Sequence, residues 1–331
     1  MMINNPYSKL MKNSEKHEQP ALSHDALLAK SCLYAQRALH AKGDNQADAY
    51  QLWAALALEL LGKASLARIH PSLIVETANP NSLLEANGIS TGTVVRTVDA
   101  NIVFARLKHT VPHFGTPIAE ACRSLATRRN AELHSGHAAF SGMPLEAWEG
   151  DFWSAAQLIL TSMKLDLDAW LGADSRVPLE LLQHVQHVKR EAARRRVNHA
   201  AMMFEEKPGG GKRSKKEKED IRNASKMIHW WDCKDKFRYL LNKVWNIQCP
   251  ACKCIAFVGG DMISEELVDD QSHAEPGWEV VEREYLPVEF FCSTCGLSLV
   301  GEEALDEVGL GNIYLEAYER EIEYEPDYGN D

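Results

Sequence analysis

The sequence has no long uninterrupted apolar run, because even the stretch from Leu52 to Leu61 contains the charged residue Glu59. A helix that crosses a bilayer needs about 20 mostly apolar residues, so no membrane span is expected. The first residues, Met1 to Gln19, are polar and lack the apolar centre of a secretory signal peptide. We therefore expect a soluble, cytoplasmic protein that has no membrane partner.

Basic residues are scarce in the C-terminal third of the chain. Residues 255–300 contain ten Asp/Glu and a single basic residue, and residues 301–331 contain eleven Asp/Glu and Arg320. The net charge of −11 also hides a basic middle, since residues 189–218 hold eleven Lys/Arg and four Glu. Because nucleic acids are bound through Lys and Arg contacts to phosphates, the middle of the chain is favoured over its end as a phosphate-binding region.

The cysteine pattern indicates a metal site rather than disulfides. Without a secretory signal, the eight cysteines are expected in a reducing compartment. Four of them form two C-x-x-C pairs, Cys249 with Cys252 and Cys292 with Cys295. Two such pairs complete a tetrahedral set of four thiolates without an open position, which is typical of a structural zinc ion. We expect one zinc ion per chain.

Strand-like residues flank the second pair, so residues 246–300 look like a zinc ribbon, a small β domain. Two alternatives stay open: Cys254 could replace Cys252 as a ligand, and an iron–sulfur cluster or redox site could replace zinc. The acidic charge of this domain favours a structural or protein-contact role. The acidic tail, residues 301–331, either only solubilises the chain or covers its basic middle and restrains activity.

The rest of the chain is expected to be helical, which makes the protein mainly α. Apolar residues recur at helical spacing between residues 21 and 172, with short connections, and this favours a helical bundle. The expected helices cover residues 24–41, 46–69, 93–108, 116–137 and 145–171. Two of them, 46–69 and 145–171, are apolar on more than one face, which places them centrally or at a subunit interface.

The flanks of the bundle are expected to differ from it. Residues 1–20 are expected to be flexible. Residues 173–245 are expected to form a basic helical connector, with helices over 178–204 and 215–244 and a flexible Gly-rich linker at 207–214.

The helix expected at 116–137 ends in a group of polar residues. Arg129, Asn130 and His134 bring a mobile cation, an amide and an imidazole, which together can contact an RNA phosphate and its 2′-hydroxyl. Asn130 and His134 are four residues apart and share a face, and the long Arg129 side chain can reach them. A simpler explanation is that the helix dipole favours His near a C-terminus. A second match to the spacing, from Arg194 to His199, shows that spacing alone is weak evidence of function.

The full form Arg129-Asn130-Ala131-Glu132-Leu133-His134 resembles the R-N-x-x-x-H motif of HEPN-superfamily ribonucleases, which include CRISPR effectors, bacterial toxins and anti-phage proteins. These families often carry E-x-x-x-K on an earlier helix beside the active site, and Glu59-Leu60-Leu61-Gly62-Lys63 matches that form. Without the resemblance, Glu59 and Lys63 would be an ordinary surface ion pair. The resemblance covers roughly residues 20–172, and HEPN domains are small helical bundles.

The resemblance implies a metal-independent endoribonuclease that cleaves RNA through 2′-hydroxyl attack, as a toxin or anti-phage defence effector. His134 would be the general base or acid, Arg129 would stabilise charge on the phosphorane, and Asn130 would orient the phosphate or His134. Glu59 and Lys63 complete the expected catalytic set. The phosphate-binding residues expected around this set are Arg128, Arg190, Arg194, Lys212 and Arg213. Catalysis is expected to need no cofactor.

The family's active site combines two motifs, so the resemblance also implies a homodimer. A regulatory or defence-system protein is expected as a further partner. In toxins that are silenced by nucleotide addition a Tyr follows the motif His by three residues, but His137 stands there in this chain, so a nucleotidyltransferase partner is not expected. The alternative function is a catalytically inactive, HEPN-like nucleic-acid-binding or regulatory scaffold protein with a structural zinc ribbon.

Overall fold

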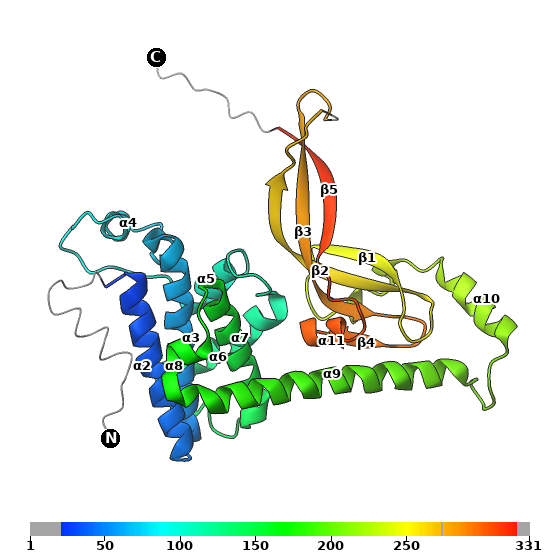
Figure 1. The fold of residues 1–331 in the computed structure, drawn as a ribbon, viewed down its shortest axis with the longest axis horizontal. Helices are drawn as coiled ribbons and strands as arrows, with labels where there is room; N and C mark the ends of the chain where they lie inside the picture. Colours follow the sequence, from blue (N-terminus) through cyan, green and yellow to red (C-terminus); the bar gives the residue numbers. More distant parts are fainter. Residues whose placement is uncertain (1–20, 273, 323–331) are drawn as a thin grey trace. The chain divides into compact units, whose positions relative to one another are not determined.

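The computed structural model describes residues 21–272 and 274–322; the segment predicted to be flexible, 1–20, and the last residues of the predicted tail lie outside this description. The chain divides into two compact units, Met1–His187 and Val188–Asp331. The first is helical, and the second is built around an antiparallel sheet, as Figure 1 shows. The prediction of a mainly α chain with a small C-terminal β domain is confirmed. None of the helices described is both long and apolar enough to span a membrane.

The helical unit contains seven α-helices among its described residues, followed by the start of an eighth. They are α2 (His24–Gly43), α3 (Ala47–Ile69), α4 (Pro80–Ala86), α5 (Ala100–Leu107), α6 (Thr116–His134), α7 (Glu149–Ser162), α8 (Leu167–Leu171) and the beginning of α9 (Arg176–Glu205). Helix α3 packs against α2, α5, α6 and α7. Its apolar residues therefore face neighbours all around it, and this burial within one chain accounts for the apolar girth seen in the sequence.

Two helices differ from their predicted lengths. The helix expected at 93–108 begins only at Ala100, where the side chain of Asp99 caps it by accepting from the Ile102 N–H at 3.0 Å. Val94, an apolar residue within the range predicted to be helical, is 90% exposed. The helix expected at 145–171 is two helices, because Asp166 caps a new one by accepting from the Ala169 N–H at 2.7 Å. Local capping side chains overrode the longer apolar periodicity in both places.

The core of the helical unit is large and rich in aromatic rings. Trp153, Tyr50 and Phe104 are its largest fully buried side chains. Two thiols are also buried there: Cys122, and Cys32, whose Sγ lies 2.8 Å from the backbone oxygen of Trp170. The thiol of Cys32 donates a hydrogen bond to that oxygen, whereas Cys122 is buried as a small apolar packing group.

Gly62 allows helices α3 and α5 to approach closely. A Cβ atom at this position would lie 2.8 Å from Cγ1 of Val103 and 3.1 Å from Cδ1 of Leu107. Such distances are shorter than van der Waals contact, so any larger residue would push the helices apart. Gly62 lies between Glu59 and Lys63, so this approach also fixes the turn of α3 that carries both charged residues.

The sheet unit begins within α9 and contains two further helices and five strands among its described residues. They are α10 (Lys215–Ser225), β1 (Lys243–Gln248), β2 (Ile255–Leu267), β3 (Trp278–Phe291), β4 (Ser298–Val300), α11 (Glu302–Asp306) and β5 (Tyr314–Glu321). The order β1-β2-β3-β4 is antiparallel throughout. Strand β3 also pairs with β5, with Val281 opposite Tyr318, while its other end pairs with β4, with Phe290 opposite Leu299 (Figure 1).

The segment predicted as an acidic tail, 301–331, is folded as far as the structure describes it. It forms α11 and β5, and β5 runs along β3. Its charges are matched across the sheet, because Arg320 pairs with Glu265 and Glu279, and Glu316 pairs with Lys243. Residues 302–321 are therefore part of the folded sheet unit and not a separate tail. Two of their acidic residues do contact the basic middle, as one of the two alternatives expected, since Glu303 pairs with Lys189 and Glu307 with Arg194.

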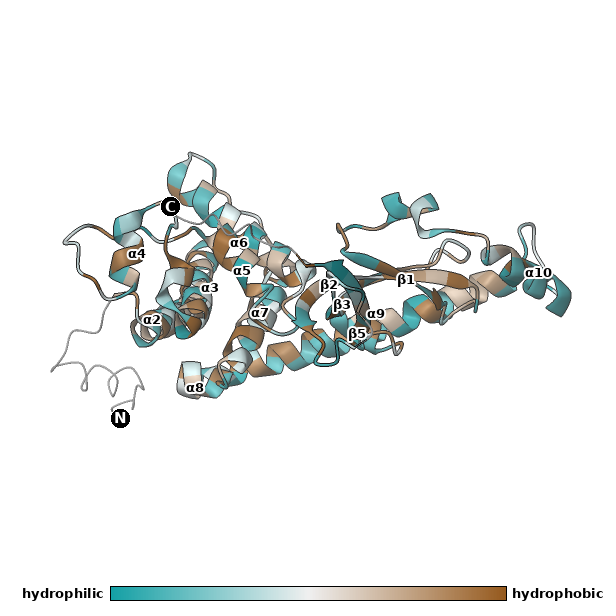
Figure 2. Ribbon diagram, turned by 90° about the horizontal axis from the view of Figure 1, so that it is seen from above, coloured by the Kyte–Doolittle hydropathy of each residue, from teal (hydrophilic) through white to brown (hydrophobic). Residues whose placement is uncertain are grey.

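The basic connector also differs from its prediction. Helix α10 is strongly hydrophilic (Figure 2) and ends at Ser225 instead of continuing to residue 244. The Oγ of Ser225 accepts from the Ile255 N–H at 2.9 Å, which ties this end to the sheet. The segment predicted as a flexible Gly-rich linker, 207–214, is a tight turn in which the Lys207 N–H donates to the Gly211 oxygen at 2.8 Å.

Candidate functional site

A carboxylate joins two cations between helices α3 and α6. Glu59 accepts from Lys63 Nζ at 2.8 Å through Oε1, and Arg129 donates to its Oε2. Lys63 also donates to the hydroxyl of Thr97 at 3.0 Å. Lys63 is only 7% exposed, so Glu59 and Lys63 are not the surface ion pair of the simpler interpretation. Three of the five predicted catalytic residues are therefore neighbours, although Arg129 is 70 residues from Glu59 in the sequence.

The other two predicted catalytic residues, Asn130 and His134, are exposed near the end of α6. Helix α6 stops at His134, earlier than predicted, because the hydroxyl of Ser135 donates to the Ala131 oxygen at 2.6 Å. Within the described residues the side chains of Asn130 and His134 have no hydrogen bond or ion pair. They are open to solvent on one face of the helix, which suits groups that would meet a substrate.

The side chain of Arg129 has a further donor in reserve. Its Nε is buried and has no hydrogen-bond partner among the described residues, while its terminal nitrogen is held by Glu59. Buried polar groups are almost always satisfied, so an unused guanidinium donor is unusual. It marks Arg129 as a residue with bonding capacity beyond its ion pair.

Arg128, predicted to bind RNA, lines a cavity of about 150 Å³ between α3, α6 and α7. One terminal nitrogen contacts the sulfur of Met143 at 2.8 Å, and its Nε is buried without a partner in the described chain. Burial lowers the pKa of Arg128. The surroundings include the apolar rings of Trp148 and Phe152 rather than other cations.

The four predicted metal ligands lie in two loops of the sheet unit that have the same backbone pattern. The N–H of Cys249 donates to the Cys254 oxygen at 2.8 Å, and the N–H of Cys292 donates to the Leu297 oxygen at 2.9 Å. In each loop the fourth residue after the first cysteine has a positive φ, 64° at Lys253 and 74° at Gly296. This left-handed residue turns the chain so that both cysteines of a pair face the same point.

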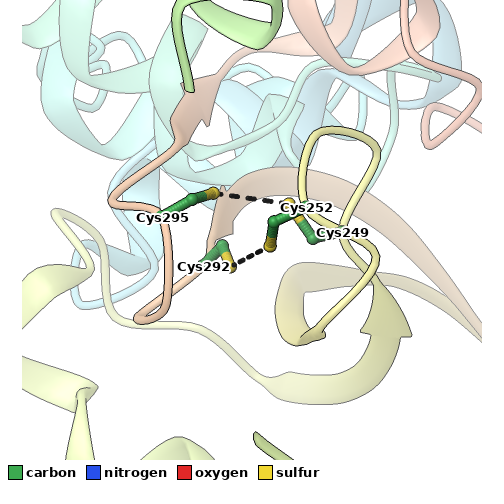
Figure 3. Close-up of side chains that lie close together, drawn as sticks. All are labelled: Cys249, Cys252, Cys292 and Cys295. Carbon is green, nitrogen blue, oxygen red and sulfur yellow. Dashed lines mark hydrogen bonds between the residues drawn. The ribbon is translucent and has the colours of Figure 1, made fainter. Parts of the chain in front are cut away.

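The four sulfurs converge as a metal site requires. Every pair of Sγ atoms lies within 4.8 Å, and the distances Cys249–Cys295 and Cys252–Cys292 are both 3.6 Å (Figure 3). Zinc–sulfur bonds of about 2.3 Å in a tetrahedron place the sulfurs about 3.8 Å apart, so the donor set fits zinc. Cys254 lies outside the group, with its sulfur 4.0 Å from the Cys252 oxygen.

Without a cation the four thiols share their protons unevenly. Hydrogen bonds from neighbouring thiols, that of Cys252 first, lower the pKa of Cys249, and those from Cys249 and then Cys252 lower the pKa of Cys292. The pKa values of Cys252 and Cys295 are raised because each acts mainly as a donor to Cys249. Part of the group is thus already inclined to be thiolate, the form that binds a metal.

Comparisons with protein-family models, curated proteins and solved structures give no match to this chain.

The basic residues predicted to bind RNA divide into two kinds. Arg194 pairs with Glu191 and Glu307, and the guanidinium of Arg213 donates to the Phe204 oxygen and lies over its ring. Arg190 and Lys212 are exposed. Two of the five therefore have structural partners that the sequence did not reveal.

The sequence analysis missed two sets of residues. Thr97 completes the group around Lys63, but no local motif identifies a hydroxyl that reaches an amine from another part of the chain. Helical spacing also places Trp231 on the packed face of the helix expected at 215–244, whereas Trp231 and its neighbour Trp230 are exposed. The alternation of aromatic and basic residues after Lys226 was the signal that should have been weighed against helical spacing.

Proposed function

We propose that this chain is a metal-independent endoribonuclease whose catalytic groups are Arg129, Asn130 and His134. The observation that carries the proposal is the Glu59 carboxylate, which joins Lys63 to Arg129. The resemblance of the motif to HEPN ribonucleases implied that these two parts of the sequence lie beside one active site. Their contact supports that assignment, because it joins two residues 70 positions apart that the resemblance placed beside the same site.

The charge of this cluster suits a phosphate ligand. Two cations and one carboxylate leave a net charge of +1, and the side chains of all three are less than about one-fifth exposed. A phosphate that approaches Arg129 would therefore meet an uncompensated positive charge in a partly dry environment, where it counts for more than in water. Glu59 and Lys63 are positioning residues in this scheme, since they hold Arg129 in place.

The reaction follows from an imidazole and a guanidinium acting on RNA. His134 would take the proton of a 2′-hydroxyl, whose oxygen then bonds to the adjacent phosphorus while the bond to the 5′-oxygen breaks. The leaving oxygen gains a proton, either from the imidazole of the second motif in the proposed homodimer or from water. Arg129 would stabilise the charge on the phosphorane, and Asn130 would orient the phosphate. The products are a 2′,3′-cyclic phosphate and a 5′-hydroxyl.

The sheet unit has a separate role in the proposal. Its four cysteines would hold one zinc ion, closed to substrate, that stabilises the β domain. Among the described residues, groups of metal-ligand type gather only at these cysteines and not near His134. The metal would therefore support folding and take no part in cleavage.

The homodimer stays part of the proposal through the resemblance alone. Helix α3 is apolar on several faces because it is surrounded within its own chain, so its composition is no argument for an interface. A toxin or anti-phage role and a regulatory protein partner are likewise proposed on the resemblance.

The test is cleavage of labelled single-stranded RNA by the full-length protein in the presence of EDTA. Wild-type protein should give products that end in a 2′,3′-cyclic phosphate, and an all-deoxy strand should stay intact. Arg129→Ala and His134→Ala should each lower the rate by about 10²–10⁴-fold, the usual worth of one such group. Glu59→Gln should slow cleavage less, because it only loosens Arg129.

His137→Ala is the matched control, since it removes an exposed imidazole three residues beyond the motif. It should cleave as the wild type does. Cleavage that persists in His134→Ala, that needs magnesium, or that also cuts DNA would contradict the mechanism. RNA binding without cleavage would identify a binding module instead, and neither activity would leave a regulatory scaffold.

A further inference from the structure

A group of aromatic rings is exposed on the sheet unit, in the irregular segment that follows α10. It consists of His229, Trp230 and Trp231, which we call the aromatic platform. The imidazole of His229 is stacked on the indole of Trp231, with ring centres 4.4 Å apart and an angle of 12° between the planes. Trp230 is 40% exposed and Trp231 is 56% exposed. Large rings at this exposure lie outside any core and are open to a ligand.

The backbone that carries the platform is fixed. The Asp232 carboxylate accepts from the His229 N–H at 3.0 Å, and the buried thiol of Cys233 donates to the Trp230 oxygen at 3.3 Å. Further along, the buried carboxylate of Glu289 accepts from the N–H groups of Arg238 and Tyr239 at 2.8 and 3.3 Å. A rigid segment loses little conformational entropy when a ligand binds to it, so the exposed rings are preorganised.

The platform lies in a locally basic stretch of an otherwise acidic region. Residues 226–238 hold four basic and two acidic residues, whereas residues 255–300 hold one and ten. Lys234 and Lys236 are exposed, and their amines form no ion pair with any described residue. One of the two acidic residues, Asp232, is occupied by its bond to the His229 backbone. Free positive charge is therefore concentrated close in sequence to the rings.

We propose that the aromatic platform binds single-stranded RNA, with bases stacked on the tryptophan rings and phosphates on Lys234 and Lys236. Aromatic rings flanked by cations are the common device for holding unpaired nucleotides, because each base offers a flat face and each phosphate a charge. The proposal builds on the ribonuclease function by naming unpaired RNA as the form of the substrate. A protein partner is disfavoured by the unpaired lysines, which are depleted from the centres of protein interfaces.

The experiment measures binding of a fluorescent oligouridylate to full-length, zinc-loaded protein that carries His134→Ala, so that cleavage does not interfere. Trp230→Ala with Trp231→Ala should weaken binding by about tenfold or more, the usual effect of losing base stacks. The matched control is Trp278→Ala, since Trp278 is 41% exposed at the start of β3, outside the platform. It should bind as the parent protein does.

Two further measurements sharpen the assignment. Lys234→Gln with Lys236→Gln should reduce the slope of log affinity against log salt by about 1.4, since each phosphate contact on a single strand contributes about 0.7. A single DNA strand should depend on the tryptophans as RNA does, because stacking does not read the sugar. Binding to double-stranded RNA should be unaffected by the tryptophan variants, since its bases are already stacked.

The outcomes separate this inference from the proposed enzyme activity. If wild-type protein does not cut RNA but the tryptophan variant loses binding, the platform stands and the ribonuclease proposal fails. If wild-type protein cuts RNA and the tryptophan variant binds within twofold of the Trp278→Ala control, the platform is overturned and the enzyme stands. Undetectable oligonucleotide binding at micromolar protein also overturns it and leaves a protein as the occupant.

Discussion

The two units of this chain are held together in different ways. The helical unit surrounds α3 with other helices and buries many large aromatic side chains. The sheet unit has a smaller cluster of buried apolar residues, and Cys249, Cys252 and Cys292 are fully buried within it. A large apolar core can stabilise a fold by itself, whereas a small domain usually needs an additional cross-link such as a disulfide or a bound metal ion.

The comparison also separates where each unit keeps its charges. In the helical unit the ion pairs of Glu59 are partly buried beside the proposed active site. In the sheet unit, ion pairs such as Arg320 with Glu279 run across exposed strands and neutralise an acidic surface. The ion pairs of Glu59 thus lie partly buried within a helical core, whereas those of the sheet unit allow strands of like charge to pair. Four variants test how the two units differ in what stabilises them.

The largest effect is expected from the metal site. Cys292→Ser, or a strong chelator, should remove the zinc and unfold the sheet unit, because structural zinc supplies about 10–16 kcal/mol to small domains. Thermal unfolding should then show the transition of the helical unit alone, and elemental analysis should fall from one zinc per chain toward none. Cys254→Ala is the control, since Cys254 is buried but lies outside the four-sulfur group. Full zinc retention in Cys292→Ser would contradict the site.

The next effect belongs to the helical unit. Trp153→Ala should lower its free energy of unfolding by about 3–5 kcal/mol, the usual cost of emptying the volume of a large buried ring. Only the transition of the helical unit should move, and the zinc content should stay the same. Leu133→Ala, which truncates an exposed side chain, should change stability by less than about 0.5 kcal/mol. Equal shifts in both transitions would show that the units do not unfold separately.

A smaller effect comes from Glu289 in the sheet unit. Burial raises its pKa, although the N–H groups of Arg238 and Tyr239 partly oppose this. The carboxyl group of Glu289 therefore holds its proton more tightly in the folded state than in the unfolded state. As pH rises from the ordinary pKa of glutamate through the raised pKa of the folded state, ionisation of Glu289 lowers the free energy of unfolding. Glu289→Gln should remove this loss.

The variant Glu289→Gln should be more stable than wild type near neutral pH, because glutamine carries no charge that burial disfavours. The advantage should vanish below the ordinary pKa of glutamate. Unfolding curves of the sheet unit at several pH values measure it. An advantage that grows toward acidic pH would have the wrong sign and refute the assignment.

The smallest effect is expected in the first cysteine loop. Lys253 has the positive φ that Gly296 supplies in the second loop. Lys253→Gly should stabilise the sheet unit by about 0.5–1 kcal/mol, because a left-handed residue with a side chain costs about 1–2 kcal/mol and glycine loses part of that gain as chain entropy. The reverse change, Gly296→Ala, should destabilise it by a similar amount. The midpoint of the second thermal transition reports both.

The parts of the fold set by local chemistry could be predicted from the sequence. The start of α6 follows from Pro117, although its end lies three residues before the predicted one, and the four metal ligands follow from two short spacings. The helix expected at 215–244 failed because apolar residues at helical spacing, such as Met227 and Trp231, are exposed rather than packed. The spacing of apolar residues predicts which side chains share a helix face, but it does not show whether another part of the chain packs against that face.

Contacts between distant segments could not be predicted in the same way. Strand β5 carries acidic residues that look like a solvated tail until Arg320 is seen between Glu265 and Glu279. Likewise Arg129 and Glu59 meet because α6 packs against α3. The resemblance suggested that meeting, but composition and spacing alone did not.

The reactivity of the cysteines also reports how often each unit opens. In the helical unit, burial raises the pKa of Cys32 to about 11 and also raises that of Cys122, so both thiols are almost inert toward alkylating reagents. They can be labelled only when that unit opens, whereas the four clustered sulfurs would become reactive when the proposed zinc ion is removed. Mass spectrometry of labelled peptides over time would thus measure, in one sample, how often each unit opens.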